Sequence, residues 1–119
     1  MKRAIITGAG GFIGGALTRH LLDKGVVVYG IDISQKNMQE WLCHENFHPI
    51  VASFEEYNTL HEQITDDKID VFFHFAWQGV FGKAFQNYEL QLNNAKYAGL
   101  ALEEAVKIGA HKFVFAGTM

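Results

Sequence analysis

Short apolar runs alternate along this chain with longer segments in which apolar residues recur every three or four positions. A short, nearly continuous apolar run is typical of a buried parallel strand, whereas recurrence at three and four positions is typical of an amphipathic helix. The apolar runs predict strands at residues 2–7, 26–31, 50–53, 71–76 and 112–116. The segments between them predict helices at residues 12–24, 34–45, 55–65 and 85–108.

The last and longest predicted helix has two apolar strips. We expect the first strip to face the sheet, and it consists of Leu92, Ala95, Gly99, Leu102 and Val106. A second strip lies beside it and consists of Tyr97, Ala98, Ala101, Ala105 and Ile108. A helix that is apolar on more than one face is buried on more than one side, so we expect a partner beyond the sheet.

Regular alternation of strand and helix predicts an α/β fold with a doubly wound, Rossmann-like parallel sheet. Because crossovers between parallel strands are right-handed, the expected strand order is 3-2-1-4-5, and the chain is truncated after the fifth strand. The 119 residues are enough for one domain with a real core. We therefore expect a single dinucleotide-binding domain over residues 1–119, the N-terminal half of a larger enzyme whose substrate part is absent.

Composition narrows the class of protein. The formal net charge is −3, which provides no electrostatic reason to expect nucleic acid or an anionic membrane as a partner. Cys43 is the single cysteine, which excludes an internal disulfide and a multi-cysteine zinc site. Thr7 and four glycines interrupt the first apolar segment, so it resembles neither a signal peptide nor a membrane span. We expect a cytoplasmic protein.

A glycine-rich run, GAGGFIG at residues 8–14, joins the first strand to the first helix. This strand–loop–helix context is what a dinucleotide fingerprint requires. Gly8 permits the tight turn, Gly11 lets backbone approach a pyrophosphate, and Gly14 lets the helix lie close to the strand. The free N–H groups and positive dipole end of the helix then favour phosphate.

An acidic residue, Asp32, ends the second strand 18 positions after Gly14. An acid about 20 residues beyond the loop is the expected partner of the adenosine ribose hydroxyls. Its charge would repel the 2′-phosphate of NADP, and neither Ile33 nor Ser34 supplies an arginine to receive one. The predicted cofactor is therefore NAD.

These segments resemble the extended short-chain dehydrogenases, the NAD-dependent epimerase/dehydratase group that modifies nucleotide sugars. Residues 7–14 resemble that family's TGxxGFIG loop, and residues 70–76 resemble its fourth-strand DxVxHxA segment. Asn94 matches the family's helix asparagine. Residues 112–118 are similar to its fifth strand, which ends in a catalytic Ser or Thr.

The resemblance implies hydride transfer between a sugar carbon and nicotinamide, a nucleotide-sugar substrate and a homo-oligomer. It assigns the catalytic hydroxyl to Thr118. The cofactor contacts that it implies are Gly8, Gly11, Phe12, Ile13, Gly14, Asp32, Ser53 and Ala76.

The chain departs from the family pattern in three places. Ser53 stands where the family has an Asp that binds the adenine amine, and Trp77 stands where a small residue is common. The family's Tyr-x-x-x-Lys dyad, in which lysine lowers the tyrosine pKa for proton transfer, is absent from these residues. Four positions after the four tyrosines stand Ile33, His61, Leu92 and Ala101. We expect this polypeptide alone to be catalytically inert.

Other interpretations stay open from the sequence. The chain is also consistent with a non-catalytic dinucleotide-binding or redox-sensing module, or with a fragment that has no independent role. His74 is predicted to be a core residue, and Asn94 either supports a bound water or bonds locally. His44 and His48 have helical spacing, but no cysteine or carboxylate motif accompanies them, so no metal site is expected.

Overall fold

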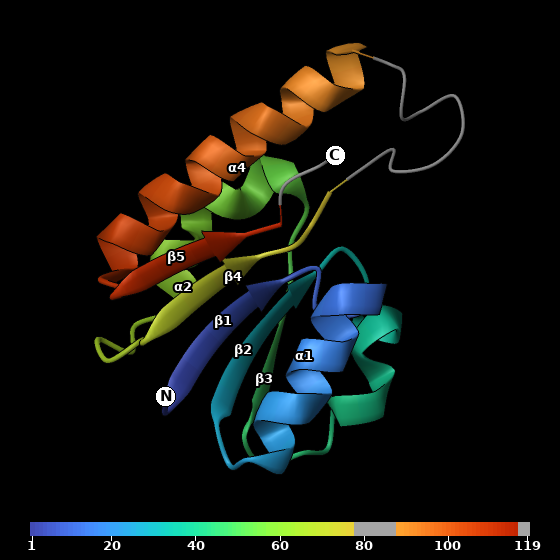
Figure 1. Cartoon of the computed structure of the whole chain (residues 1–119), viewed down its shortest axis with the longest axis vertical. Helices are drawn as coiled ribbons and strands as arrows, with labels where there is room; N and C mark the ends of the chain where they lie inside the picture. Colours follow the sequence, from blue (N-terminus) through green and yellow to red (C-terminus); the bar gives the residue numbers. More distant parts are fainter. Residues whose placement is uncertain (78–87, 117–119) are drawn as a thin grey trace.

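The computed structural model describes residues 1–77 and 88–116, which build one five-stranded sheet between two helical layers (Figure 1). Its strands are β1 (Arg3–Thr7), β2 (Val27–Asp32), β3 (Phe47–Val51), β4 (Val71–His74) and β5 (Lys112–Phe115). Every neighbouring pair is parallel, and the order is β3-β2-β1-β4-β5. The doubly wound class and strand order predicted from the sequence are confirmed.

Helical elements cover both faces of the sheet (Figure 1). On one face lie α1 (Phe12–Asp23) and the 3-10 helix η1 (Gln35–Trp41). On the other lie the 3-10 helix η2 (Phe54–Thr59), α2 (Leu60–Gln63) and the long α4 (Tyr88–Ile108). No helix in the two described ranges has the length and apolar character needed to cross a bilayer.

The sheet separates two hydrophobic cores, and β1 contributes to both. Side chains alternate between the faces of a strand, so Ala4 and Ile6 join the core beneath α1, whereas Ile5 joins the core beneath α4. All three side chains are fully buried. The central strand is therefore covered on both sides, as a parallel strand requires.

Two predicted helices are shorter and tighter than expected. The segment predicted as a helix at 34–45 is the 3-10 helix η1, and the one predicted at 55–65 divides into η2 and α2. Polar side chains explain this, because they bond to nearby backbone: Ser34 accepts from Lys36 N, and Thr59 donates to the Glu56 carbonyl. Such local bonds favour short tight turns over continuous α-helix.

The third strand was predicted to start after Pro49, but β3 begins at Phe47 and contains the proline. Among the strands that the structure describes, β3 pairs with β2 alone and lies at the sheet edge, so a residue without an N–H is tolerated there. β4 ends at His74 and β5 at Phe115, two residues and one residue before their predicted ends.

The predicted sheet-facing strip of α4 is wrong. Leu92, Leu102 and Val106 are 65%, 46% and 71% exposed. The face that packs on the sheet is the second predicted strip, whose alanines are small enough for close approach. Of that strip Ala101, Ala105 and Ile108 are buried, and two polar residues of α4 that belong to neither predicted strip, Asn94 and Glu104, are buried as well.

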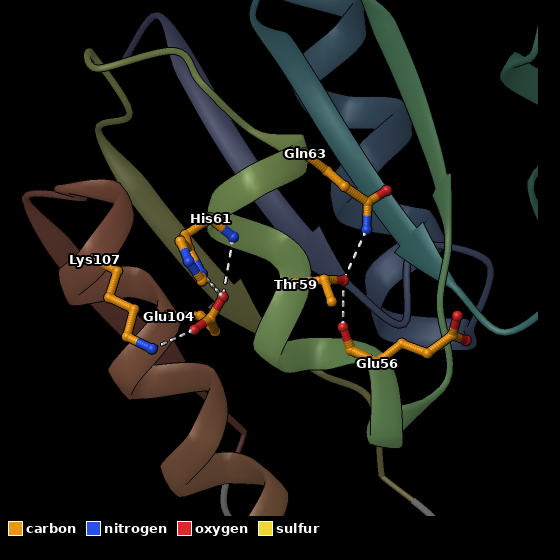
Figure 2. Close-up of polar contacts among 6 residues, drawn as sticks. All are labelled: Glu56, Thr59, His61, Gln63, Glu104 and Lys107. Carbon is orange, nitrogen blue, oxygen red and sulfur yellow. Dashed lines mark hydrogen bonds and ion pairs between the residues drawn. The ribbon is translucent and has the colours of Figure 1, made fainter.

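The buried carboxylate of Glu104 ties α4 to α2 (Figure 2). Its Oε1 accepts from the His61 backbone N–H at 2.9 Å and lies 2.8 Å from His61 Nδ1. Lys107 Nζ lies 3.3 Å from Oε2. Burial acts to raise the pKa of Glu104, but the hydrogen bonds from His61 and Lys107 outweigh it and hold the pKa below its ordinary value. This polar contact explains how an acid is accommodated on the sheet-facing side.

Candidate functional site

A cavity of about 590 Å³ opens at the carboxyl edge of the sheet. The segments after β1, β2, β3 and β4 converge there, at the point where the strand order reverses; such a crevice is where doubly wound sheets bind ligands. All eight residues predicted to contact the cofactor line this cavity: Gly8, Gly11, Phe12, Ile13, Gly14, Asp32, Ser53 and Ala76.

The loop needs glycine at different positions for different physical reasons. Gly8 has φ +68°, and an added Cβ would lie 2.9 Å from Ala76 N. A Cβ on Gly14 would collide with the Gly8 carbonyl oxygen, so the start of α1 lies tightly against the loop. A Cβ on Gly11 would meet that same oxygen at a milder 3.2 Å. The fold thus demands glycine at 8 and 14, whereas Gly11 mainly leaves backbone open toward the cavity.

The carboxylate of Asp32 is bound to the loop as well as facing the cavity. Its Oδ2 accepts from Gly10 N at 2.9 Å, and its Oδ1 accepts from Asn37 Nδ2 at 2.8 Å and Ser34 N at 3.3 Å. The residue is only 9% exposed. Three N–H donors hold the charge in a fixed position, and a carboxylate has further lone pairs that can accept from a ligand hydroxyl.

Asn37 is a cavity residue that sequence reasoning missed. It lies so close to Gly10 that a Cβ on that glycine would overlap the Asn37 backbone. The available signal was weak: an asparagine five positions after an acid in a segment of ordinary polarity.

His74 is a buried core residue, as predicted, and it joins the ends of β1 and β4. The Thr7 hydroxyl oxygen accepts from Phe75 N at 3.1 Å and Ala76 N at 3.2 Å, and it lies 2.7 Å from His74 Nδ1. With both lone pairs of the hydroxyl engaged, its proton is donated to Nδ1, so the imidazole is neutral. Burial lowers the pKa of His74 to about 4, in agreement with that assignment.

The hydrogen bonds of the Thr7 hydroxyl at the end of β1 position the backbone after β4 at Ala76, which lines one wall of the cavity. The sequence identified Thr7 as part of the family loop and as a polar interruption of the first apolar segment, and did not predict its bond to His74. The Nε2 atom of His74 has no hydrogen-bond partner among the residues that the structure describes.

Two departures from the family pattern also lie in the cavity wall. Ser53 follows β3, and both its backbone N–H and its hydroxyl donate to Glu56 Oε1, at 2.9 and 3.1 Å. These two bonds lower the pKa of Glu56, the backbone bond contributing most. Trp77 follows the end of β4, and its indole N–H donates to Gln91 Oε1 of α4 at 3.0 Å, which fixes the ring.

The remaining candidates lie elsewhere. Asn94 donates to Gln91 Oε1 at 3.2 Å, which is a local bond three residues back along α4. His44 lies outside any helix, and His48 lies in β3, stacked on Tyr29, so these two histidines do not share a helical face. Across residues 1–77 and 88–116, no three His, Cys, Asp or Glu side chains are grouped to hold a metal. Thr118, the predicted catalytic residue, lies outside the described residues.

Comparison with known proteins places this geometry in context. The curated UDP-N-acetyl-alpha-D-glucosaminuronate decarboxylase of Bacillus cytotoxicus is 32% identical over 124 residues, spanning 98% of this chain and 36% of that protein. The solved structure of the UDP-Glc/GlcNAc 4-epimerase from Campylobacter jejuni is 20% identical, with a TM-score of 0.79, over 97% of this chain and 36% of that one.

A second solved structure, MoeE5 in complex with UDP-glucose and NAD, has a TM-score of 0.77 at 22% identity. It is matched over 97% of this chain and 36% of its own length. At such identities the two structures show the shared fold, and the chain spans little more than a third of each relative. The model of the NAD dependent epimerase/dehydratase family matches residues 4–119, nearly the entire sequence. The chain therefore belongs to the NAD dependent epimerase/dehydratase family.

Proposed function

We propose that this chain is the NAD-binding portion of a nucleotide-sugar oxidoreductase of the epimerase/dehydratase type. The observation that carries the proposal is the fixed carboxylate of Asp32 beside the glycine loop, both in the wall of one cavity. A negative acceptor next to open backbone N–H groups and a helix start suits a ribose linked to a pyrophosphate.

The order of the cavity residues across the sheet edge supports a dinucleotide. Ser53 follows β3, Asp32 ends β2, the glycine loop follows β1, and Ala76 follows β4. Because neighbouring strands lie about 4.8 Å apart, these groups form an extended row. In this proposal Ser53 is at the adenine end, the loop holds the pyrophosphate, and Ala76 with Trp77 borders the nicotinamide end.

The proposed reaction belongs to the whole protein. NAD, when bound, supplies a hydride acceptor at its nicotinamide. One relative is a decarboxylase of a UDP-linked sugar and another was solved with UDP-glucose bound, which supports a nucleotide sugar as the substrate. A hydroxyl at Thr118 would hydrogen-bond a substrate oxygen, while the Tyr-x-x-x-Lys dyad is not found in these residues. The role of residues 1–119 is thus to bind and orient the cofactor.

Isothermal titration of the 119-residue chain with NAD and NADP tests the proposal. We expect NAD to bind more tightly, because a 2′-phosphate would face the Asp32 carboxylate. Asp32→Ala is expected to weaken NAD about tenfold or more and to narrow the preference over NADP, since a hydrogen bond to a charged group contributes about 1.5–3 kcal/mol.

The matched control is Asp67→Ala, which removes an exposed carboxylate that does not line the cavity. It is expected to leave both affinities unchanged. Tighter binding of NADP than NAD, or an equal loss of affinity in the two variants, would contradict the proposal.

A further inference from the structure

Glu56 does not line the cavity, yet it determines how a side chain in the cavity wall presents its hydrogen. The carboxylate Oε1 of Glu56 accepts both the backbone N–H and the hydroxyl of Ser53, at 2.9 and 3.1 Å. Ser53 itself lines the cavity, between Ala52 and Phe54. An ionised carboxylate has no proton to donate, so the direction of the Ser53–Glu56 hydrogen bond is unambiguous.

Counting protons and lone pairs shows what Ser53 can still do. A hydroxyl has one proton and two lone pairs. The proton is donated to Glu56, and the backbone N–H of Glu56 takes at most one lone pair in the capping box that the two residues form. A lone pair remains, so Ser53 can accept a hydrogen bond from a ligand and cannot donate one.

The walls around Ser53 suit a flat heterocycle. Ile33 is 65% exposed and lines the cavity next to Asp32, and Phe54 lines it next to Ser53. The Phe54 ring stacks on the Tyr97 ring, with 4.9 Å between the ring centroids, and makes an edge contact with the Tyr57 ring, with 5.4 Å between the centroids. These two contacts hold the Phe54 ring in place. Apolar and aromatic walls with one fixed polar group are typical of a site that selects among similar rings.

We propose that Glu56 is a positioning residue that holds Ser53 as an acceptor-only group, so that the site selects adenine over purines with a 6-oxo group. Adenine presents an amine donor at its 6-position, whereas hypoxanthine presents a carbonyl acceptor there, which would face another acceptor. This inference rests on the proposed NAD-binding function and adds a residue outside the cavity to it. The family has a carboxylate at the position of Ser53. In this chain the carboxylate belongs to Glu56, three residues later, and accepts the proton of the Ser53 hydroxyl.

The test is a titration of the 119-residue chain with NAD and with nicotinamide hypoxanthine dinucleotide. We expect the native chain to bind NAD about tenfold more tightly than the hypoxanthine dinucleotide. The Ser53 oxygen and the 6-oxo group would face each other with no proton between them, and tenfold in affinity corresponds to about 1.4 kcal/mol. Ser53→Ala and Glu56→Ala are each expected to reduce that preference to about twofold or less, because the first removes the hydroxyl and the second removes the oxygen that accepts its proton. Ser53→Thr retains the hydroxyl and is expected to retain the preference.

Glu55→Ala is the matched control, because it removes a carboxylate from the same turn, and the hydrogen bonds of Ser53 in the described part of the chain go to Glu56 and not to Glu55. Circular dichroism verifies that each variant is folded. A Glu56→Ala variant that keeps the full preference would show that the carboxylate only caps η2. Equal binding of the two dinucleotides by the native chain would overturn the inference and leave the NAD proposal standing. Absence of NAD binding by the native chain would overturn both.

Discussion

At the scale of single residues, the glycine loop separates what the fold requires from what a ligand requires. Gly8 adopts a positive φ, and Gly14 lies against the Gly8 carbonyl, so both are needed to form the loop at all. Gly11 has an ordinary conformation and a milder contact. It is therefore the position where a side chain tests ligand binding with the least damage to the fold.

Gly11→Val is expected to give a folded chain that no longer binds NAD measurably. The branched side chain would occupy the space where backbone approaches the pyrophosphate, while the sheet cores contain no atom of this residue. Isothermal titration and circular dichroism provide the two readouts. Gly99→Val, at an exposed position with nothing within 4 Å of an added Cβ, is the control. Unchanged NAD affinity in Gly11→Val would mean that the loop is only a turn.

His74 is expected to make stability fall as the pH is lowered. Burial lowers its folded pKa from 6.5 to about 4. Above pH 6.5 the ring is neutral in both states and contributes nothing. Below that pH the unfolded chain binds a proton that the folded chain refuses until about pH 4, so the free energy of unfolding decreases by up to about 3 kcal/mol across this window.

His74→Asn tests this expectation, because the amide oxygen can accept from the Thr7 hydroxyl and does not titrate. Urea unfolding at pH 7 and pH 4.5 is expected to show a smaller loss of stability in His74→Asn than in the native chain. His20→Asn, at an exposed position of α1, is the control and should follow the native chain. Identical pH dependence in all three proteins would refute the role of His74.

At the scale of elements, α4 combines an exposed apolar face with a sheet-facing side that carries a charge. Glu104 is accommodated there because His61 of α2 and Lys107 surround its carboxylate (Figure 2). The same contact holds the short α2 against α4. A helix of four residues has little stability of its own, so its position depends on this packing and on the core around Leu60.

Glu104→Gln is expected to destabilise the chain by about 1–3 kcal/mol at pH 7, because it leaves His61 and Lys107 without the charge they surround. The lowered pKa of Glu104 means that the native contribution is complete above the ordinary glutamate value and is lost as the pH falls through the folded value. The difference between native and variant should therefore shrink in acid. Urea titrations at pH 7 and pH 4 measure it, with exposed Glu103→Gln as the control; a constant difference would contradict the assignment.

At the scale of the whole molecule, an apolar surface is exposed in the part of the chain that the structure describes. Tyr88, Leu92, Leu102 and Val106 form an exposed row along α4, and Phe115 is 55% exposed on the edge strand β5. An apolar helix face and an open sheet edge are both surfaces that favour association. The notion of a homo-oligomer, implied by the family resemblance, thus has a specific surface to test.

We expect the 119-residue chain to self-associate through this row. Replacing Leu102 and Val106 together by Glu should raise the dissociation constant at least about tenfold, because each apolar side chain contributes roughly 1.5–3 kcal/mol when buried. Analytical ultracentrifugation over a concentration series measures the effect. Thr65→Glu adds a charge at an exposed position off α4 and is the control. A native chain that stays monomeric at high concentration would contradict this expectation.

The amino-acid pattern by itself determined the sheet and its strand order. Apolar runs and their spacing are local properties, and the right-handed crossover rule converts their sequence into a topology. The glycine loop and the acid at the end of the second strand were also readable, because their chemistry depends on positions close along the chain. The cavity gathers all the residues that this reasoning assigned to the cofactor, while their contact with NAD stays a prediction.

Only the tertiary structure decided which apolar strip of α4 faces the sheet, because two strips with the same period are equivalent until neighbours choose between them. The strip that faces the sheet is the one whose Ala101, Ala105 and Ile108 join the core, and beside it Glu104 contacts His61, 43 positions away. The Thr7–His74 bond joins residues 67 positions apart, and the Asp32–Gly10 bond spans 22. Periodicity records which residues repeat along one element, whereas these contacts depend on how separate elements are packed together, and that information appears only once the chain has folded.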